Sequence, residues 1–190
     1  MDPAEPLFPV FLKLSDRRVV VVGGGPIAAT KLSGLLSAGA RVTVVSPEVS
    51  PAIPSDRVTL KQRKFQSGDL DNAWLTVAAA PPPVNREVAL AAESRCLFVN
   101  AVDDPPNATA YLGGVIRRAG VTVAISTDGK APGLASLIRQ ALDVLLPEEE
   151  VKRWLSVAKE QRARWIDQGI PIHQRRPLLL RALDNLYQDR

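Results

Sequence analysis

The sequence has very little cysteine or histidine, with one cysteine, Cys96, and one histidine, His173, among 190 residues. A single cysteine excludes an internal disulfide, and because Cys96 directly precedes an apolar run we expect it in the core rather than as a nucleophile. A single histidine leaves no serine–histidine–acid pattern and no cluster of metal ligands, so we expect no resident metal. We expect His173 itself at the surface or in packing.

Long hydrophobic runs are also missing. The apolar stretches are too short to cross a bilayer and the chain opens with no basic and apolar signal segment, so we expect a cytoplasmic protein and no membrane partner. The Lys and Arg residues are scattered along the chain, and no dense run of them has aromatic residues in between. We therefore do not expect a nucleic-acid partner. The formal net charge of +4 nevertheless favours an anionic ligand.

The most informative segment that is present is a glycine-rich turn between an apolar run and a helical pattern. Val19–Val22 are four consecutive β-branched residues, which is typical of a strand buried on both faces. Gly23-Gly24-Gly25-Pro26-Ile27-Ala28 follows and matches the Gly-x-Gly-x-x-Gly/Ala dinucleotide fingerprint. Apolar residues then recur at helical spacing until Gly39, so the N-terminus of this helix would face the cofactor phosphates.

The acidic residue that usually follows the second strand of such a unit is missing. We expect that strand at 41–45, and it runs into Ser46-Pro47-Glu48 instead of an Asp or Glu that would bind the ribose hydroxyls. Ser46 can make one hydrogen bond there, whereas Glu48 comes two residues late. Because no arginine follows immediately to hold a 2′-phosphate, the sequence favours NAD over NADP.

Strands and helices alternate through the first half of the chain. Further strands are expected at 58–60, 74–80 and 97–102 and a helix at 84–94, which predicts a mostly parallel sheet wound in the Rossmann manner.

The pattern changes at about residue 105. Strand-like runs at 110–116 and 121–126 flank a short turn and predict an antiparallel hairpin, and helical patterns follow at 133–146 and 148–190. We therefore expect an α/β protein with a Rossmann nucleotide-binding domain at 1–107, a small hairpin and helix domain at 108–146, and an α-helical domain at 147–190.

An acidic pair ends the fifth expected strand. Asp103 and Asp104 follow Asn100-Ala101-Val102 at the sheet edge where an open α/β fold holds its ligand, so one of them could serve as a general base. The same pair could instead open a turn before Pro105. The residues by themselves leave both interpretations open.

Several segments together resemble the precorrin-2 dehydrogenase family, which includes stand-alone dehydrogenases and the amino-terminal module of siroheme synthase. Besides the glycine loop, the resemblance rests on Asn100-x-Val102-Asp103 and on Ile125-Ser126-Thr127-x-Gly129-Lys130-x-Pro132. Many folds share the glycine loop, whereas the other two segments together are much less common. The resemblance is strong to about Leu146 and loose in the helical tail.

The resemblance implies NAD-dependent oxidation of precorrin-2 to sirohydrochlorin, a step toward siroheme and, in some pathways, cobalamin. It implies that Asp103 is the catalytic aspartate and accepts a proton while hydride leaves the tetrapyrrole for the nicotinamide. It also implies a homodimer in which the hairpin domain forms the dimerisation domain. The carboxylates of the tetrapyrrole give the excess of Lys and Arg a purpose, with Lys130, Arg117 and Arg139 as candidates to bind them.

The expected site residues follow from the loop and from the resemblance. The cofactor-binding residues are expected to be Gly23, Gly25, Pro26, Ile27, Ala28, Ser46, Pro47, Glu48, Ala79 and Ala80. The substrate-binding residues are expected to be Asn100, Arg117, Ser126, Thr127 and Lys130. Where relatives carry a threonine and acidic residues after the fourth strand, this chain has Ala80-Pro81-Pro82-Pro83, which leaves backbone contacts from that loop to the cofactor. Asp128 replaces a usual glycine.

Two other specific functions stay open, besides a Rossmann oxidoreductase that acts on some other small molecule. A bifunctional dehydrogenase and sirohydrochlorin ferrochelatase would use the same aspartate, so the sequence does not separate it from the dehydrogenase. A non-catalytic NAD-sensing module of the kind that regulates ion channels would leave Asp103 as a turn residue. The segment 125–132 and the helical tail argue against this second alternative.

Overall fold

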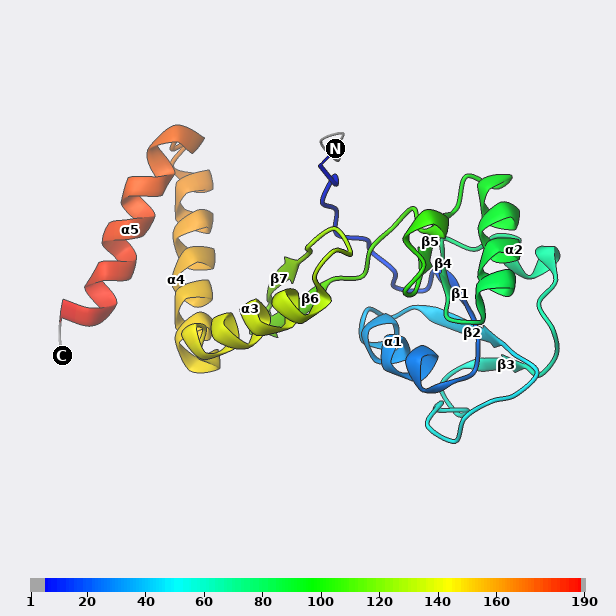
Figure 1. Cartoon of the computed structure of the whole chain (residues 1–190). Helices are drawn as coiled ribbons and strands as arrows, with labels where there is room; N and C mark the ends of the chain where they lie inside the picture. Colours follow the sequence, from blue (N-terminus) through cyan, green and yellow to red (C-terminus); the bar gives the residue numbers. More distant parts are fainter. Residues whose placement is uncertain (1–5, 189–190) are drawn as a thin grey trace. The chain divides into compact units, whose positions relative to one another are not determined.

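The computed structural model describes residues 6–188, which form two compact units divided between Leu112 and Gly113 (Figure 1). The boundary that we expected at residue 107 lies a few residues before this division. The further separation of 108–146 from 147–190 stays a prediction. No helix in the described part of the chain is long and apolar enough to span a membrane.

The first unit is a parallel sheet with helices on both faces. Its elements are β1 (Arg18–Val22), α1 (Pro26–Ser37), β2 (Arg41–Val45), β3 (Thr59–Lys61), η1 (Ser67–Leu70), β4 (Leu75–Ala78), α2 (Pro82–Glu93), β5 (Phe98–Ala101) and η2 (Pro105–Asn107), where η marks a short 3-10 helix. The strands pair in parallel in the order β3-β2-β1-β4-β5. Because the strand order reverses between β1 and β4, a ligand site is expected at their carboxyl ends. The prediction of a Rossmann sheet is confirmed.

The valines of β1 connect the two hydrophobic layers of this unit. Val19 and Val21 pack on the α1 side, where Ala28, Leu32 and Leu35 face the sheet. On the other face Val20 and Val22 pack with the α2 residues Val88 and Ala92. Every β1 valine is at most 2% exposed, and complete burial of such a side chain contributes about 1.5–3 kcal/mol. The glycine loop after β1 therefore starts from a rigid strand.

The largest differences from the expected boundaries of the first unit lie at the end of β4 and the start of α2. β4 ends at Ala78 rather than Ala80, and α2 begins at Pro82 rather than Val84. The prolines suit this position because the first helical residues need no N–H partner and proline already has the helical φ. They open the helix instead of only breaking the strand.

The expectation that Cys96 lies in the core was wrong. The thiol side chain is exposed, and the residue has a φ of +51° in the turn between α2 and β5. Its N–H donates to the carbonyl of Glu93 at 3.0 Å, which continues the end of α2 as a tight turn. The apolar run that suggested burial begins one residue later, with Leu97 in the core.

The second unit consists of a hairpin followed by three helices. They are β6 (Gly114–Arg118), β7 (Val121–Ile125), α3 (Pro132–Leu145), α4 (Glu148–Asp167) and α5 (Ile172–Gln188). The antiparallel hairpin is confirmed, although its first strand starts at Gly114 rather than Ala110. The helical stretch expected over 148–190 is interrupted at 168–171, where Gly169 has a φ of +66° and Pro171 lacks an N–H. Its last two residues lie outside the described part. His173 is at the surface, as expected.

Candidate active site

The three positions of the glycine fingerprint have three different environments. Gly23 has a φ of +119°, and a Cβ there would lie 2.7 Å from the carbonyl carbon of Ala79. Ala28, at the third position, is fully buried against the sheet. A Cβ on Gly25 would meet no protein atom within 4 Å. The loop is thus tight against the protein on one side and open at Gly25, which fits the close approach of a pyrophosphate to bare backbone.

The first turn of α1 completes this anion-binding arrangement. Gly25 is the N-cap residue, and no side chain caps the helix. Pro26 opens the helix without an N–H, so the N–H groups that the first turn leaves unpaired come from the residues after it. The helix dipole favours negative charge at this end. These features fit the phosphates of a dinucleotide. Backbone N–H groups and the helix dipole can bind them without a charged side chain.

The ends of β2 and β4 flank the glycine loop. The N–H of Gly23 donates to the carbonyl of Val45 at 3.0 Å, and a Cβ on Gly24 would lie 2.9 Å from Oγ of Ser46. On the other side, the N–H of Ala79 donates to the carbonyl of Val22 at 2.8 Å. Ser46 is buried, whereas Pro47 and Glu48 are exposed. The structure therefore brings the residues expected at the cofactor together at one sheet edge.

Asn85 positions the loop after β4, a role that the sequence analysis did not assign. Its Oδ1 accepts the N–H of Ala80 at 3.0 Å, and the side chain is 2% exposed. Since Ala80 has no polar side chain, the orientation of its backbone decides what the loop offers to a ligand. One sequence signal was the position of Asn85 in the first turns after a strand, which many structural residues share. The pair Val84-Asn85 also belongs to the segments that resemble the precorrin-2 dehydrogenase family.

The structure separates the roles of Asp103 and Asp104. Both oxygens of the Asp104 carboxylate accept hydrogen bonds from Nδ2 of Asn107, at 2.9 and 3.0 Å. Asp103 is exposed, and its carboxylate accepts no hydrogen bond from residues 6–188. Its φ of +55° is in the left-handed region, which Asp tolerates better than most residues. Asp104 thus stabilises the turn, whereas the Asp103 carboxylate is available to a ligand.

Asn100 lies in β5, three residues before Asp103. Its Nδ2 donates to the carbonyl of Ala110 at 3.0 Å. Its Oδ1 is buried and has no hydrogen-bond partner within the described residues. An unpaired buried amide oxygen is costly, so Asn100 has the capacity to accept one further hydrogen bond.

The other expected substrate residues belong to the second unit. Ser126 accepts the N–H of Asp128 through Oγ at 3.1 Å, and Thr127 accepts the N–H of Ala131 through Oγ1 at 3.2 Å. Asp128 has a φ of +54°, which explains why a glycine is usual at its position. Lys130 and Arg117 are exposed. Thus Ser126, Thr127 and Lys130 share one loop before α3, while Arg117 lies on β6.

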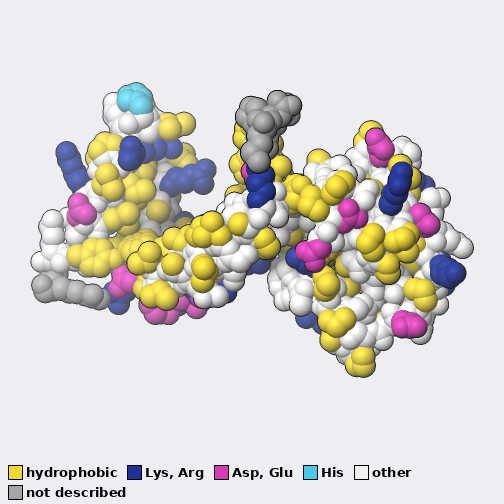
Figure 2. Space-filling view, in the orientation of Figure 1, with side chains coloured by type: hydrophobic (Ala, Val, Ile, Leu, Met, Phe, Trp, Pro, Cys, Tyr) yellow, Lys and Arg dark blue, Asp and Glu magenta, His cyan; other side chains and the backbone are white. Residues whose placement is uncertain are grey.

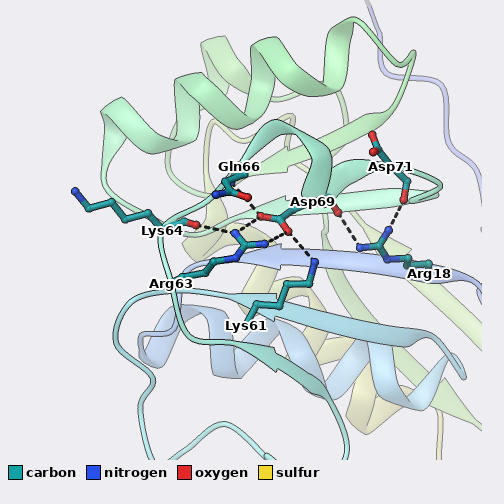
Figure 3. A network of polar contacts seen from close by, with 7 residues as sticks. All are labelled: Arg18, Lys61, Arg63, Lys64, Gln66, Asp69 and Asp71. Carbon is teal, nitrogen blue, oxygen red and sulfur yellow. Dashed lines mark hydrogen bonds and ion pairs between the residues drawn. The ribbon is translucent and has the colours of Figure 1, made fainter.

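A charged cluster at the carboxyl end of β3 was also missed by the sequence analysis (Figure 3). Asp69 is 2% exposed and pairs with Lys61 at 2.8 Å and with Arg63 at 2.6 Å. Hydrogen bonds from Arg63 hold the pKa of the Asp69 carboxyl far below its usual range, burial opposes this effect, and Lys61 and the N–H of Gln66 add to it. The same pair raises the pKa of Arg63. Asp69 is therefore ionised at neutral pH.

The sheet order, the glycine loop and the open α1 N-terminus define a nucleotide-binding protein of the Rossmann class. A model of the family described as "Putative NAD(P)-binding" matches residues 10–114. The chain belongs to this NAD(P)-binding family.

The curated relatives of the chain include two siroheme synthases. The chain is 37% identical over 182 residues to a siroheme synthase of Methylobacillus flagellatus, covering 85% of this chain and 39% of the relative. It is 38% identical over 175 residues to that of Salmonella typhi, covering 88% and 38%. The chain thus spans about two fifths of the length of these curated relatives.

A solved structure matches nearly the whole chain. It is that of SirC, precorrin-2 dehydrogenase, with a TM-score of 0.74 and 29% identity, covering 95% of this chain and 92% of that one. The resemblance inferred from the motifs is confirmed by this match.

Proposed function

We propose that this protein oxidises precorrin-2 to sirohydrochlorin with NAD as the hydride acceptor. The likeness to SirC, precorrin-2 dehydrogenase, supports this proposal most strongly because it extends over 95% of this chain and 92% of that one. The relatives named siroheme synthase support the same chemistry. The experiment is to give purified protein precorrin-2 and NAD and to follow sirohydrochlorin and NADH by absorbance.

The glycine loop and the α1 N-terminus would hold the cofactor. When bound, NAD supplies the acceptor for the hydride that leaves the reduced tetrapyrrole. Gly25 presents bare backbone to the pyrophosphate, and Asn85 fixes the orientation of the Ala80 peptide beside it. Because β1 and β4 flank the topological switch, the adenosine would extend toward β2 and the nicotinamide toward β5.

Asp103 is the proposed general base. It follows β5, two strands from β1 in the sheet, which is about 10 Å at the usual strand spacing. Loss of two electrons and one proton as hydride leaves one further proton to be removed, and the free carboxylate of Asp103 can accept it. Asp104 cannot replace it without releasing Asn107.

Basic side chains of the second unit, together with the hydroxyl groups of Ser126 and Thr127, are proposed to bind the substrate carboxylates. Lys130 is 64% exposed, and its Nζ lies 3.9 Å from a carboxylate oxygen of Asp128, so this contact is weak. Arg117 is exposed, in contrast to Arg118, which pairs with Asp143 at 2.5 Å. Lys130 and Arg117 are therefore more available to an anionic tetrapyrrole than Arg118.

We also propose that the protein works as a homodimer through α3. Leu134, Leu137 and Leu145 are exposed at helical spacing, with Leu137 64% exposed, and Figure 2 shows hydrophobic side chains gathered over this helix. An apolar stripe of this kind on a helix that also contacts a two-stranded hairpin is typical of a protein interface. A second copy of the chain would bury it.

A further inference from the structure

The end of β2 is where a Rossmann protein distinguishes NAD from NADP. The usual acidic residue is replaced by Ser46, so no carboxylate stands at this position itself to repel a 2′-phosphate, and Glu48 follows two residues later. The N–H of Ser46 donates to the carbonyl of Lys61 at 3.2 Å. Lys61 is therefore a direct neighbour of the residue that would face the ribose.

Two basic residues, Lys61 and Arg63, lie close to this position. Lys61 ends β3, which pairs in register with β2, and Arg63 follows two residues later. Adjacent strands are about 5 Å apart, so the Lys61 side chain starts close to a group attached to the ribose. Arg63 starts near Lys61, because its N–H donates to the Lys61 carbonyl at 2.9 Å. An arginine or lysine in this place would ordinarily favour a 2′-phosphate.

Both cations are already engaged by one buried carboxylate (Figure 3). Arg63 donates from Nη1 to Oδ2 of Asp69 at 2.8 Å and from Nη2 to Oδ1 at 2.6 Å, while Nζ of Lys61 donates to Oδ1 at 2.8 Å. Nη1 of Arg63 also donates to the carbonyl of Lys64 at 2.8 Å. The planar fork that would bind a phosphate is thus turned toward Asp69.

We propose that Asp69 is a specificity-determining residue that favours NAD over NADP by holding Lys61 and Arg63 away from a 2′-phosphate. The inference rests on the proposed cofactor function and adds a residue to it. A bound 2′-phosphate would have to break the two-pronged pair of Arg63 with Asp69 to gain its own. Asp69 thereby acts in place of the missing acid after β2, by neutralising cations rather than by binding the ribose.

Binding of NAD and NADP to the full chain tests the proposal, because the two ligands differ only in the 2′-phosphate. In Asp69→Asn, one or two freed cations should strengthen NADP binding relative to NAD about tenfold or more, and high salt should reduce the gain. NAD affinity itself should change little. The double variant Asp69→Asn/Arg63→Gln should return most of the way to the wild-type ratio. An unchanged ratio in a folded Asp69→Asn protein would overturn the proposal.

Arg63→Gln with Asp69 intact provides a test that does not depend on the folding of the Asp69 variant. If Asp69 holds Arg63, the guanidinium makes no close pair with the 2′-phosphate. NADP affinity of Arg63→Gln should then stay within about twofold of wild type. A clear loss of NADP affinity in Arg63→Gln would show that Arg63 already contacts the 2′-phosphate and would overturn the proposal. Failure of the wild-type protein to bind either dinucleotide would instead refute the cofactor assignment.

Discussion

Asn107 donates its side-chain amide to both carboxylate oxygens of Asp104, while the adjacent Asp103 carboxylate accepts no hydrogen bond from the described residues. Two neighbouring carboxylates of the same turn thus have different surroundings. One is part of the fold, and the other is available for chemistry. The sequence did not show which of the two is the base and which opens the turn. The structure assigns each a separate role that can be tested.

The first prediction compares these two residues. Asp103→Asn should reduce precorrin-2 oxidation by about 10²–10⁴-fold, the usual contribution of a general base, with NAD affinity nearly unchanged. Asp104→Asn should keep most of the activity and lose about 1 kcal/mol of unfolding free energy, because a charged hydrogen-bond acceptor becomes neutral. Turnover assays, NAD titration and urea unfolding measure the three quantities. Normal turnover by Asp103→Asn would move the base elsewhere.

The second prediction concerns Gly25. The Cβ of a valine there would meet no protein atom within 4 Å, and the φ of −82° is allowed, so Gly25→Val should cost only about 1 kcal/mol from the weaker N-cap. Its side chain would occupy the space of the pyrophosphate, so NAD affinity should fall at least about tenfold.

Gly34 provides the matched control for Gly25, since it is exposed in the interior of α1 and also has open space around its missing Cβ. Gly34→Ala should raise the unfolding free energy by about 0.5–1 kcal/mol and leave NAD affinity unchanged. If Gly25→Val bound NAD as well as wild type, the glycine loop would not be the phosphate site.

The third prediction concerns Asn85. Asn85→Ala removes the acceptor for the Ala80 N–H in a buried place and should cost about 1–3 kcal/mol of unfolding free energy. It should also weaken NAD binding several-fold, because the loop after β4 loses its fixed orientation. Glu87→Ala, on the exposed face of the same helix, should change neither. A stability loss without any change in NAD affinity would leave Asn85 with a structural role alone.

The fourth prediction follows from the lowered pKa of Asp69. A carboxyl whose pKa is lower in the folded than in the unfolded protein stabilises the fold at pH values above its unfolded pKa, and this stabilisation is lost as pH falls toward the folded pKa. Asp69→Asn should therefore be less stable than wild type by about 1–3 kcal/mol at pH 7.

Urea unfolding between pH 3 and pH 7 measures the difference between Asp69→Asn and wild type. The difference should be constant above about pH 5 and should shrink as pH falls below the usual Asp pKa of about 3.9. A difference that did not depend on pH would mean that the ionised carboxylate is not what stabilises the fold.

The fifth prediction concerns the exposed apolar stripe of α3. The wild-type protein should sediment as a dimer, and Leu137→Glu should sediment as a monomer, since it places a charge in the expected interface. Glu149→Lys, at an exposed position in the first turn of α4, should remain dimeric. A wild-type monomer at micromolar concentration would remove the dimer from the account.

The fold was predictable where burial and backbone geometry leave few choices. Four consecutive valines at 19–22 predict an interior strand of a parallel sheet, and the glycine fingerprint predicts the turn that follows it. The break at Gly169 was missed because apolar stripes continue on both sides of it, and periodicity alone does not mark a short turn. Cys96 was misplaced by one residue, which in a tight turn is enough to reverse burial.

The candidate site was predictable where a motif carried it. The position of Asp103 was clear from the strand that it follows, but what distinguishes it from Asp104 is the bond of Asp104 with Asn107, a partner that only the folded turn supplies. The cluster of Lys61, Arg63 and Asp69 joins the end of a short strand to a 3-10 helix. Because such charges are usually solvated, nothing in the sequence distinguished them from ordinary surface residues.

The most direct test of the proposed function is turnover of precorrin-2 by the purified wild-type protein with NAD. Sirohydrochlorin and NADH should form in equal amounts, and the rate should be lost in Asp103→Asn and kept in Asp104→Asn. A folded protein that binds NAD but forms neither product would contradict the proposed function.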